Sequence, residues 1–545
     1  MKKLKPLIPA YILSFVFSFM LYIFEPLTMY GTNVNDFWFD LYIMLPPIIV
    51  AALLMFFFMC GIFTAIYFIN KKYSDKLRFY HISMVIAFIV FVCFYIQGNY
   101  LVSGLPGLDG SKIKWNDYKD QELISFIVYA VVTVIMVVCC IKFKLKAVVD
   151  TTKYISLAIF IMLLTGLITT CTSNNLIRKK SGVLSTTKNY NTASTDQNFY
   201  IFLVDAADSV MFDKQLSKKE YKNTFKDFTY FKDTSSVYGY TRDSVPQILG
   251  GMINDNTYGF HKYSTLAMDN SKLIQELQNR GYDINIYEDS LIWDSDKASE
   301  VSNLVKAKRA VKYPQFIKNV TKYSLFKYLP FSLKKYSKIE TMYFNNSKVK
   351  DNIDYFLWGN STNYNIFKNE QIEKVDNKYF HFIHLEGAHV PFGTCKDFTS
   401  SNKCGYSDKL QASIVLIKSY LDRLKKYDVY DNAAIMVMSD HGYVIGNKNG
   451  AYGRTNPILF IKGVDEHHDM LRSTKPVSYT DLDNAYVDLL DGKKSYELFD
   501  GIEYPRERII MWYKYTKENH MVEYVQTGKA WDEKTLKKTG KEYNR

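Results

Sequence analysis

Apolar residues are distributed very unevenly along this chain. Nearly all long apolar runs occur before about Cys171, and the rest of the sequence is rich in Tyr, Lys, Asn and Asp. A helix that crosses a bilayer needs roughly 20 predominantly apolar residues. Five runs meet this requirement and are predicted to be transmembrane helices: Leu7–Ile23, Leu41–Ile69, Ile82–Gln97, Leu123–Ile141 and Tyr154–Thr170. No small-residue cleavage site follows the first run, so we interpret it as a span and not as a signal peptide.

The charges of the connecting loops predict the orientation of these spans. Lys and Arg are in excess before the first span and in the second and fourth loops, whereas the first loop is acidic and the third is mixed. Because loops rich in Lys and Arg stay in the cytoplasm, the N-terminus is predicted to be cytoplasmic. Five crossings then place the rest of the chain outside. We therefore expect a multi-pass protein of the cytoplasmic (inner) membrane with an extracytoplasmic globular domain.

Beyond about residue 198, short β-forming runs alternate with helical periodicity. This pattern predicts an α/β domain with a mainly parallel sheet between helices. The expected organisation is a five-span transmembrane unit (residues 1–172), a polar linker along the membrane surface (173–197) and the globular domain (198–545). Within that domain, the run Ile509–Tyr515 is predicted to contribute to a small closing sheet.

Three predicted strands end close to polar side chains that can bind ligands. They are Phe199–Val204, followed by Asp205; Tyr379–Leu385, which contains His384 and is followed by Glu386, Gly387 and His389; and Ala433–Met438, followed by Ser439, Asp440 and His441. Open α/β sheets place their sites beyond the carboxyl ends of the strands. We therefore expect these polar side chains to meet at one edge of the sheet.

The segment Tyr238–Gly251 (YGYTRDSVPQILGG) contains a candidate nucleophile, Thr241. Gly239 permits a tight turn, and a helix can begin just after it. At a helix N-terminus the dipole and the free N–H groups stabilise an anion, which favours nucleophilic chemistry there. The alternative is that Thr241 merely caps the helix, which is the commoner role of a threonine at this position.

Taken together, these residues predict one metal-dependent site. Asp205, Asp440 and His441 would bind a divalent metal ion, and the Thr241 hydroxyl would be the fourth ligand. Coordination lowers the pKa of a hydroxyl that is otherwise a poor nucleophile at neutral pH. An oxygen-rich set with one imidazole suits zinc or manganese. A second metal ion during turnover is left open.

The two histidines of HLEGAHVP, His384 and His389, lie five residues apart at the end of a predicted strand. Lone histidines are usually structural, but this chain has only nine, and three of them fall in the two strand-end motifs. We expect His384 and His389 to hold phosphoryl oxygens of a substrate or to protonate a leaving alkoxide.

The net charge of +13 does not indicate a nucleic-acid partner, because the Lys residues are scattered among Asp and Glu and form no recognisable binding module. A positive surface facing anionic lipid or envelope polymer fits the composition better. Of the seven cysteines, only Cys395 and Cys404 lie in the globular part. An isolated pair outside the cytosol is predicted to form a loop-closing disulfide.

The order of these motifs resembles the alkaline-phosphatase/sulfatase superfamily: a strand ending in Asp205, then TRDSVP, HLEGAHVP and SDHG. The five spans before this domain make the chain similar to lipid A phosphoethanolamine transferases and lipoteichoic acid synthases. The resemblance implies that Thr241 is the nucleophile of a phosphothreonine intermediate and that Asp440 and His441 are paired metal ligands. It also implies a membrane phospholipid as donor and an envelope glycan, polymer or lipid as acceptor. The histidine turn would contact the substrate or a second metal.

The sequence departs from those two branches at three places. Asp205 stands where Glu is usual, and the stretch GAYGRTNP after SDHG offers Arg454 where the phosphoethanolamine enzymes keep a histidine. Their cysteines flanking the nucleophile are absent. The expected function is a transferase for phosphoglycerol or phosphoethanolamine, and the departures leave the donor open.

Two alternatives remain at this point. The first is a hydrolase, either a phosphodiesterase or a phosphatase; a formylglycine sulfatase is disfavoured, because that chemistry needs Cys or Ser in a C/S-x-P-S-R pattern where this chain has Thr241-Arg242-Asp243-Ser244. The second is a non-catalytic protein that binds lipid and regulates a partner. Metal content separates the second alternative from the enzymes, and the fate of a Thr241 adduct separates transfer from hydrolysis.

Overall fold

The computed structural model describes most of the chain. The described residues are 2–33, 37, 39–73, 77–102, 113, 115–173, 183–289, 291, 293–306, 311–337, 339, 342–345, 353–443, 451, 453–513 and 520–545. They form two compact units. The first unit comprises Met1–Ser181 and Ala307–Asp351, and the second comprises Gly182–Lys306 and Asn352–Arg545.

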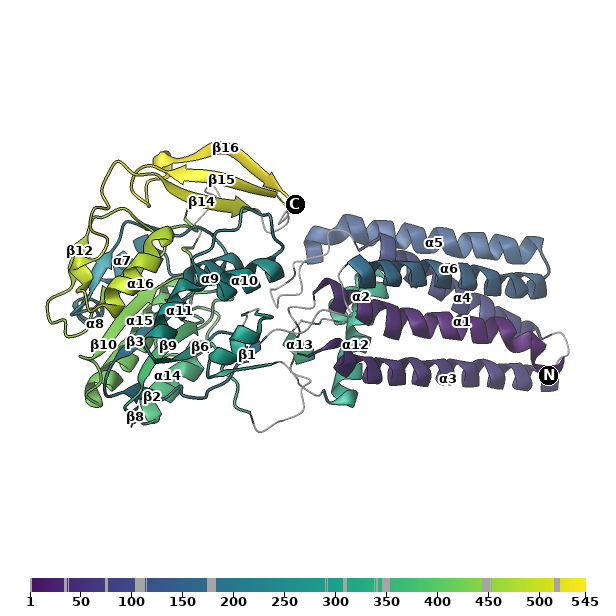
Figure 1. Ribbon diagram of the computed structural model, residues 1–545. Helices are drawn as coiled ribbons and strands as arrows, with labels where there is room; N and C mark the ends of the chain where they lie inside the picture. The colour runs from purple at the N-terminus through teal and green to yellow at the C-terminus, as the bar shows by residue number, and fades with distance from the viewer. Residues whose placement is uncertain are drawn as a thin grey trace. The chain divides into compact units, whose positions relative to one another are not determined.

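The first unit contains five helices that are long and apolar enough to cross a membrane, which confirms the five predicted spans. The first span is composed of α1 (Ile8–Phe19), a π-helical segment (Met20–Phe24) and α2 (Glu25–Thr32). The others are α3 (Leu41–Tyr73), α4 (Arg78–Tyr100), α5 (Lys119–Lys142) and α6 (Leu145–Ser173). Figure 1 shows them side by side as a bundle. The direction in which they cross the membrane stays a prediction from the loop charges.

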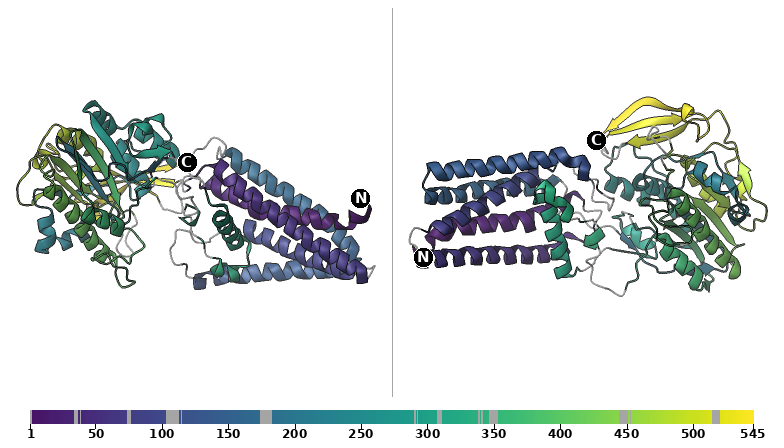
Figure 2. Two further views of the ribbon diagram at one scale, coloured as in Figure 1. Left: turned by 90° about the horizontal axis from the view of Figure 1, so that it is seen from below. Right: turned by 180° about the vertical axis from the view of Figure 1, so that it is seen from behind.

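The division of the chain corrects the predicted domain boundaries, because residues 307–351 belong with the spans and not with the globular unit. This insertion includes α12 (Tyr313–Tyr328), a 3-10 segment (Phe331–Tyr336) and α13 (Met342–Asn345). Figures 1 and 2 show α12 lying across one end of the bundle. The physical reason is apolar burial: Phe316, Val320 and Phe326 share one buried cluster with side chains of the spans.

Polar contacts fix α12 at this end of the bundle. Ser324 Oγ donates to the carbonyl of Leu21, 2.6 Å away, inside the π-helical segment, where the regular ladder of backbone hydrogen bonds is interrupted. The Glu25 carboxylate is 1% exposed and lies 2.7 Å from Lys327 Nζ. Tyr328 OH donates to the same carboxylate oxygen at 2.9 Å. The insertion is therefore held by a buried ion pair as well as by apolar packing.

Breaking this ion pair from one side should loosen α12. A buried charge left without its partner costs about 3–5 kcal/mol. We expect Lys327→Met to reduce the hydrogen-exchange protection of α12 in the purified full chain. The double variant Glu25→Gln/Lys327→Met removes both charges and should recover most of that protection. Unchanged protection in the single variant would show that the ion pair does not hold the insertion.

The second unit is built on a seven-stranded sheet in the order β12-β4-β11-β10-β3-β9-β6. Its centre is parallel: β10 (Ala433–Met438), β3 (Asn198–Val204), β9 (Lys378–Leu385) and β6 (Tyr282–Tyr287). On the other side, β11 (Leu459–Lys462) is antiparallel to β10 and to β4 (Thr229–Phe231), and β12 (Leu471–Ser473) is parallel to β4. The predicted α/β fold with a mainly parallel sheet is confirmed.

Helices cover both faces of this sheet, as Figures 1 and 2 show. Alternate residues of β3 point to opposite faces: Phe199 and Ile201 pack in one buried cluster and Tyr200 and Phe202 in another. The first cluster includes apolar side chains of α9 (Thr241–Gly250), α10 (Phe260–Asp269), α11 (Lys272–Asn279) and α16 (Leu482–Leu490). The second includes those of α7 (Ser209–Gln215), α8 (Lys219–Thr224), α14 (Asn360–Asn369) and α15 (Tyr406–Lys426).

The predicted linker is also corrected in part. Its second half forms two buried strands of the globular unit, β1 (Val183–Ser185) paired with β7 (Leu304–Lys306), and β2 (Thr192–Ser194) paired with β8 (Glu373–Val375). Ser185 finds its partners inside the unit: its hydroxyl donates to the carbonyl of Glu288 at 2.7 Å and accepts from the Glu288 N–H at 3.1 Å. The first half of the linker, residues 174–182, lies outside the described residues.

Two smaller predictions for the globular unit are confirmed. Cys395 and Cys404 form a disulfide with 5.2 Å between their Cα atoms. A three-stranded sheet is formed by β14 (Arg508–Tyr513), β15 (His520–Gln526) and β16 (Leu536–Asn544). The predicted strand Ile509–Tyr515 falls on β14, although its last two residues lie outside the described ones.

Candidate active site

The structure brings the three predicted metal ligands together. Asp205 follows β3, and Asp440 and His441 follow the neighbouring parallel strand β10, with Leu203 in register with Met438. One potential ligand atom from each residue lies within 4.8 Å of the other two, and all three residues are buried. The adjacency of two parallel strand ends is therefore what assembles the group.

The hydrogen bonding of the two carboxylates fits a divalent cation. Asp440 Oδ1 accepts the backbone N–H groups of Ala206, at 3.0 Å, and His441, at 2.9 Å. Asp440 Oδ2 and Asp205 Oδ1 are buried and have no hydrogen-bond partner among the described residues. Burying charged oxygens without partners is costly. A positive ion between them would remove that cost.

A hydrogen bond to a backbone carbonyl determines which ring nitrogen of His441 can bind the metal. His441 Nδ1 lies 2.7 Å from the carbonyl oxygen of Gly442. A carbonyl can only accept, so Nδ1 carries the proton and Nε2 presents a lone pair. Nε2 lies 3.3 Å from Asp440 Oδ2 and 3.3 Å from Thr241 Oγ1. In metal-binding histidines, one ring nitrogen typically donates a hydrogen bond and thereby orients the other toward the metal. Here Nδ1 donates and Nε2 is free to coordinate.

Thr241 is the first residue of α9, and Tyr240 occupies the N-cap position without a side-chain capping bond. Besides its 3.3 Å contact with His441 Nε2, the Thr241 hydroxyl lies 3.4 Å from Asp205 Oδ2. The hydroxyl thus faces the candidate metal ligands and is not the N-cap group of α9. The capping alternative does not describe this threonine.

The two predicted histidines occupy different environments. His384 is fully buried, with Nδ1 2.5 Å from Glu288 Oε2 and Nε2 3.4 Å from Asp205 Oδ2. Burial disfavours the imidazolium, but Glu288 and Asp205 outweigh it and raise the pKa of His384 well above its ordinary value. For Asp205, burial acts to raise the pKa, and the neighbouring His384, His389 and His441 lower it overall.

His389 is only partly buried. The Trp358 ring contacts both histidines, with centroids 5.7 Å from His384 and 5.4 Å from His389. Gly387 has a φ of 57°, and a Cβ there would stand 2.4 Å from the backbone nitrogen of Asp205. Only glycine lets this turn approach the strand end so closely. Lys409 Nζ donates to the His389 carbonyl at 2.6 Å and so holds the turn in place.

Glu288 is a further residue of this site that was not predicted from the sequence. It follows β6, the parallel neighbour of β9, so the strand-end argument applied to Asp205 applies to it as well. Its neighbour Asp289 shows the crowding of acidic groups there, because burial, and after it the Glu288 charge, raises the pKa of Asp289 to about 7. The sequence pattern that could have revealed Glu288 is the short alternating run YDINIY, which directly precedes the Glu-Asp pair.

Glu288 should matter for metal binding through His384. Glu288→Gln keeps the shape of the side chain but removes the charge that orients the imidazole next to Asp205. Loss of such outer partners typically lowers metal affinity about 10–100-fold. We expect a decrease of that size for Zn²⁺ or Mn²⁺ in calorimetric titration of the purified chain. Glu276→Gln, on the surface helix α11, is the control, and equal affinities in both variants would contradict this role.

Two arginines lie close to Thr241 in sequence or space. Arg242 Nη2 donates to Tyr513 OH at 3.1 Å, and its guanidinium packs 5.0 Å from the centroid of Phe260. The Arg454 guanidinium stacks 4.6 Å from the ring centroid of Tyr240, and its carbonyl accepts from Gly442 N–H at 2.8 Å. Arg454, the residue noted where related enzymes keep a histidine, therefore lies beside both motifs. Gly450 and Tyr452 of the same stretch lie outside the described residues.

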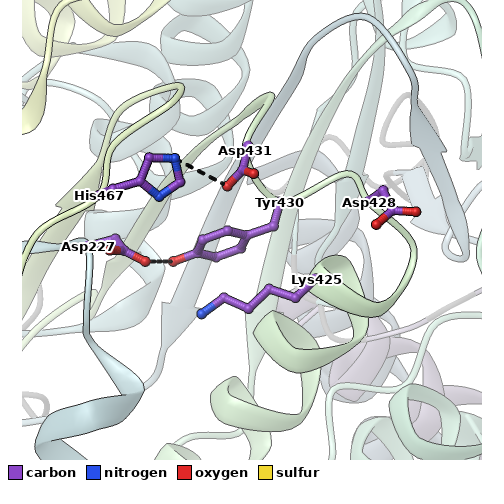
Figure 3. A pocket seen from close by; sticks show the side chains of 6 residues that line it. All are labelled: Asp227, Lys425, Asp428, Tyr430, Asp431 and His467. Carbon is purple, nitrogen blue, oxygen red and sulfur yellow. Dashed lines mark hydrogen bonds and ion pairs between the residues drawn. The ribbon is translucent and has the colours of Figure 1, made fainter.

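A separate surface hollow of about 360 Å³ contains none of the predicted site residues. It is lined by Asp227, Lys425, Asp428, Tyr430, Asp431 and His467. Figure 3 shows two contacts between its lining residues: Tyr430 OH donates to Asp227 at 3.2 Å, and His467 lies 3.8 Å from Asp431. Tyr430 and Asp431 precede β10, whereas Asp440 follows it, so the hollow lies at the opposite end of that strand.

Comparisons with known proteins give one family match and several similar structures. The sulfatase family model matches residues 214–469, a segment that contains Thr241, the histidine turn and the Asp440-His441 pair. Structures similar to this chain include Ps i-CgsB in complex with k-i-k-neocarrahexaose (14% identity, 61% of this chain and 82% of that one, TM-score 0.40). Others are the periplasmic domain of EcEptC from Escherichia coli (10%, 63% and 92%, 0.33) and the lipoteichoic acid synthase LtaP from Listeria monocytogenes (12%, 63% and 88%, 0.35).

No curated protein sequence matches the chain. The family match and the site rest on the same part of the molecule, since the matched segment lies mainly in the unit with the parallel sheet. Residues 214–469 of this chain are therefore similar to the sulfatase family.

Proposed function

We propose that this protein is a metal-dependent transferase that moves a phosphorylated head group, phosphoglycerol or phosphoethanolamine, from a membrane phospholipid to an envelope glycan, polymer or lipid. The proposal is carried by one observation: the Thr241 hydroxyl lies 3.3 Å from His441 Nε2 and 3.4 Å from Asp205 Oδ2. The five apolar helices of the other unit support a donor that resides in the bilayer. In this proposal the globular unit is extracytoplasmic.

Asp205, Asp440 and His441 would hold one divalent ion, zinc or manganese, with Thr241. When bound, the ion lowers the pKa of the hydroxyl and stabilises negative charge on the phosphoryl group. The unpaired buried oxygens of the two aspartates support this assignment over a non-catalytic role. A protein that only binds lipid has no use for two carboxylates kept without partners.

The proposed first step exchanges one ester for another. Thr241 Oγ attacks phosphorus, the bond between phosphorus and the diacylglycerol oxygen breaks, and the hydroxyl proton leaves Thr241. The departing alkoxide takes up a proton and is released as diacylglycerol. The partly exposed His389 would hold a phosphoryl oxygen or deliver that proton. His384, enclosed between Glu288 and Asp205, positions the aspartate instead.

In the second step, a hydroxyl or amine of the acceptor attacks the phosphothreonine and regenerates the Thr241 hydroxyl. Water in place of the acceptor would make the same site a phosphodiesterase, so the two functions differ only in this step. Threonine lacks the thiol or the primary alcohol from which formylglycine is made, so a formylglycine-type sulfatase mechanism is not proposed.

The test is head-group release by the metal-loaded full chain in detergent. Fluorescently acylated phosphatidylglycerol and phosphatidylethanolamine are supplied separately, and fluorescent diacylglycerol is measured. We expect release from at least one lipid, and loss of release on chelation. Metal-loaded protein that releases diacylglycerol from neither lipid would refute the proposal.

A further inference from the structure

The insertion that joins the membrane unit has an unusual charge pattern. Residues 311–337 contain six lysines and neither Asp nor Glu, although acidic residues nearly balance basic ones over the whole chain, 55 against 68. The lysines are Lys312, Lys318, Lys322, Lys327, Lys334 and Lys335. A basic segment that also carries apolar and aromatic side chains is typical of an element that lies on an anionic membrane surface.

Two of these lysines are already used inside the unit. Lys327 pairs with Glu25 at 2.7 Å. Lys334 Nζ donates to the carbonyls of Phe326 and Lys327 at the end of α12, at 2.6 and 2.7 Å, and burial lowers its pKa to about 7. Lys312, Lys318 and Lys335 are exposed and have no ion pair among the described residues. These three remain free to meet an external anion.

The place of the insertion on the bundle supports contact with lipid. The segment touches Glu25, the first residue of α2 in the last third of the first span, and Gly98 near the end of α4 packs against the Tyr328 ring. Phe331 N–H donates to Ser125 Oγ, near the start of α5, at 3.3 Å. These three points lie at one end of an up-and-down bundle. The segment therefore lies where the spans leave the hydrocarbon.

Apolar and aromatic side chains of this region are exposed next to the free lysines. Tyr313 and Leu333 are each 43% exposed and Tyr336 is 77% exposed. Trp115, which begins the fourth span, packs against Phe331 with ring centroids 6.0 Å apart. Aromatic rings gather at the level of the lipid head groups. At that level the acyl chains lie on one side and the phosphates on the other. Exposed apolar groups flanked by cations can contact both.

We propose that residues 311–337 form an interfacial platform that binds the head groups of anionic phospholipids in the outer leaflet of the predicted orientation, through Lys312, Lys318 and Lys335. The consequence of this lipid binding rests on the proposed function: the platform would enrich an anionic donor lipid around the enzyme. An anionic donor is phosphatidylglycerol and not zwitterionic phosphatidylethanolamine. The transferred group is then phosphoglycerol.

The experiment measures lipid enrichment without catalysis. The full chain is placed in phosphatidylcholine nanodiscs containing a small fraction of fluorescent phosphatidylglycerol, phosphatidylserine or phosphatidylethanolamine, and energy transfer from the protein's tryptophans is recorded. Each lysine near an anionic surface contributes about 1 kcal/mol, a factor of about five. We expect enrichment of both anionic lipids over phosphatidylethanolamine, weakened by salt. In the variant Lys312→Gln/Lys318→Gln/Lys335→Gln, the enrichment of anionic lipid over phosphatidylethanolamine should be at least about tenfold smaller than in the wild type.

The controls separate charge from folding and binding from chemistry. Lys219→Gln/Lys222→Gln/Lys226→Gln removes the same charge from exposed positions of the globular unit and should keep the preference. Thr241→Ala should also keep it, so the platform can stand even if the proposed transfer fails. The proposal would be overturned if the wild type enriched phosphatidylethanolamine and phosphatidylglycerol equally. It would also be overturned if the insertion triple variant kept the wild-type preference.

Discussion

Thr241→Ala is expected to abolish head-group release at saturating metal while the protein keeps its fold. The side chain gives no capping bond to α9, and among the described residues its hydroxyl contacts only Asp205 and His441. Its loss should therefore change the free energy of unfolding by no more than about 0.5 kcal/mol. The reaction, however, loses its nucleophile. Removing a catalytic nucleophile costs on the order of 10³-fold or more in rate. Diacylglycerol release from phosphatidylglycerol measures this loss.

The matched control for this variant is Thr241→Ser. Serine keeps a hydroxyl at the same position and should retain part of the activity, whereas alanine retains none. Two carboxylates and an imidazole remain in both proteins, but only serine keeps the fourth ligand, so alanine should bind the metal more weakly and both are compared at saturating metal. Release by the alanine variant at a rate comparable to that of the wild type would remove Thr241 as the nucleophile.

Asp440→Asn has the second large effect, the loss of the metal. Asparagine can still accept the N–H groups of Ala206 and His441 through Oδ1, so the local backbone is kept. What disappears is the charge on the buried, unpaired Oδ2. Outer partners of metal ligands are worth about 10–100-fold in affinity, and a direct ligand should exceed that range. Elemental analysis of the purified protein should show little zinc or manganese.

Asp440→Asn should also change the melting temperature, and the direction of that change should depend on whether metal is present. Without metal, the wild type buries two unpaired carboxylate oxygens, and Asp440→Asn relieves part of that cost. The variant should therefore melt at a higher temperature than the wild type in a chelator. With saturating metal the order should reverse, because only the wild type gains binding energy. Normal metal content in the variant, or the same melting order in both conditions, would argue against this site.

The core of the site could be predicted from the sequence because parallel strands end together. Asp205 and Asp440 each follow a short apolar run that is easy to recognise, and the register of β3 with β10 places them side by side. Glu288 obeys the same rule, but its strand lies in the long stretch between Thr241 and the histidine turn. Pairing of β6 with β9 joins residues about a hundred positions apart, and no local pattern reports such a pairing.

The roles of the two histidines and the course of the insertion could not be predicted either. Spacing placed His384 and His389 in one turn but could not tell that the first is enclosed by acidic groups and the second is partly exposed. Similarly, the helical periodicity of α12 is local, whereas its partner is Glu25, three hundred residues earlier. A buried carboxylate in a span is costly without a cation, and the cation came from a distant part of the chain.

The central claim is that Thr241 carries the head group between donor and acceptor. The most direct measurement is peptide mass spectrometry on the metal-loaded full chain after incubation with phospholipid in the absence of an acceptor. The expected result is a Thr241 peptide that carries a phosphoglycerol or phosphoethanolamine group and is missing from Thr241→Ala. An unmodified Thr241 in protein that has released diacylglycerol under these conditions would contradict the claim.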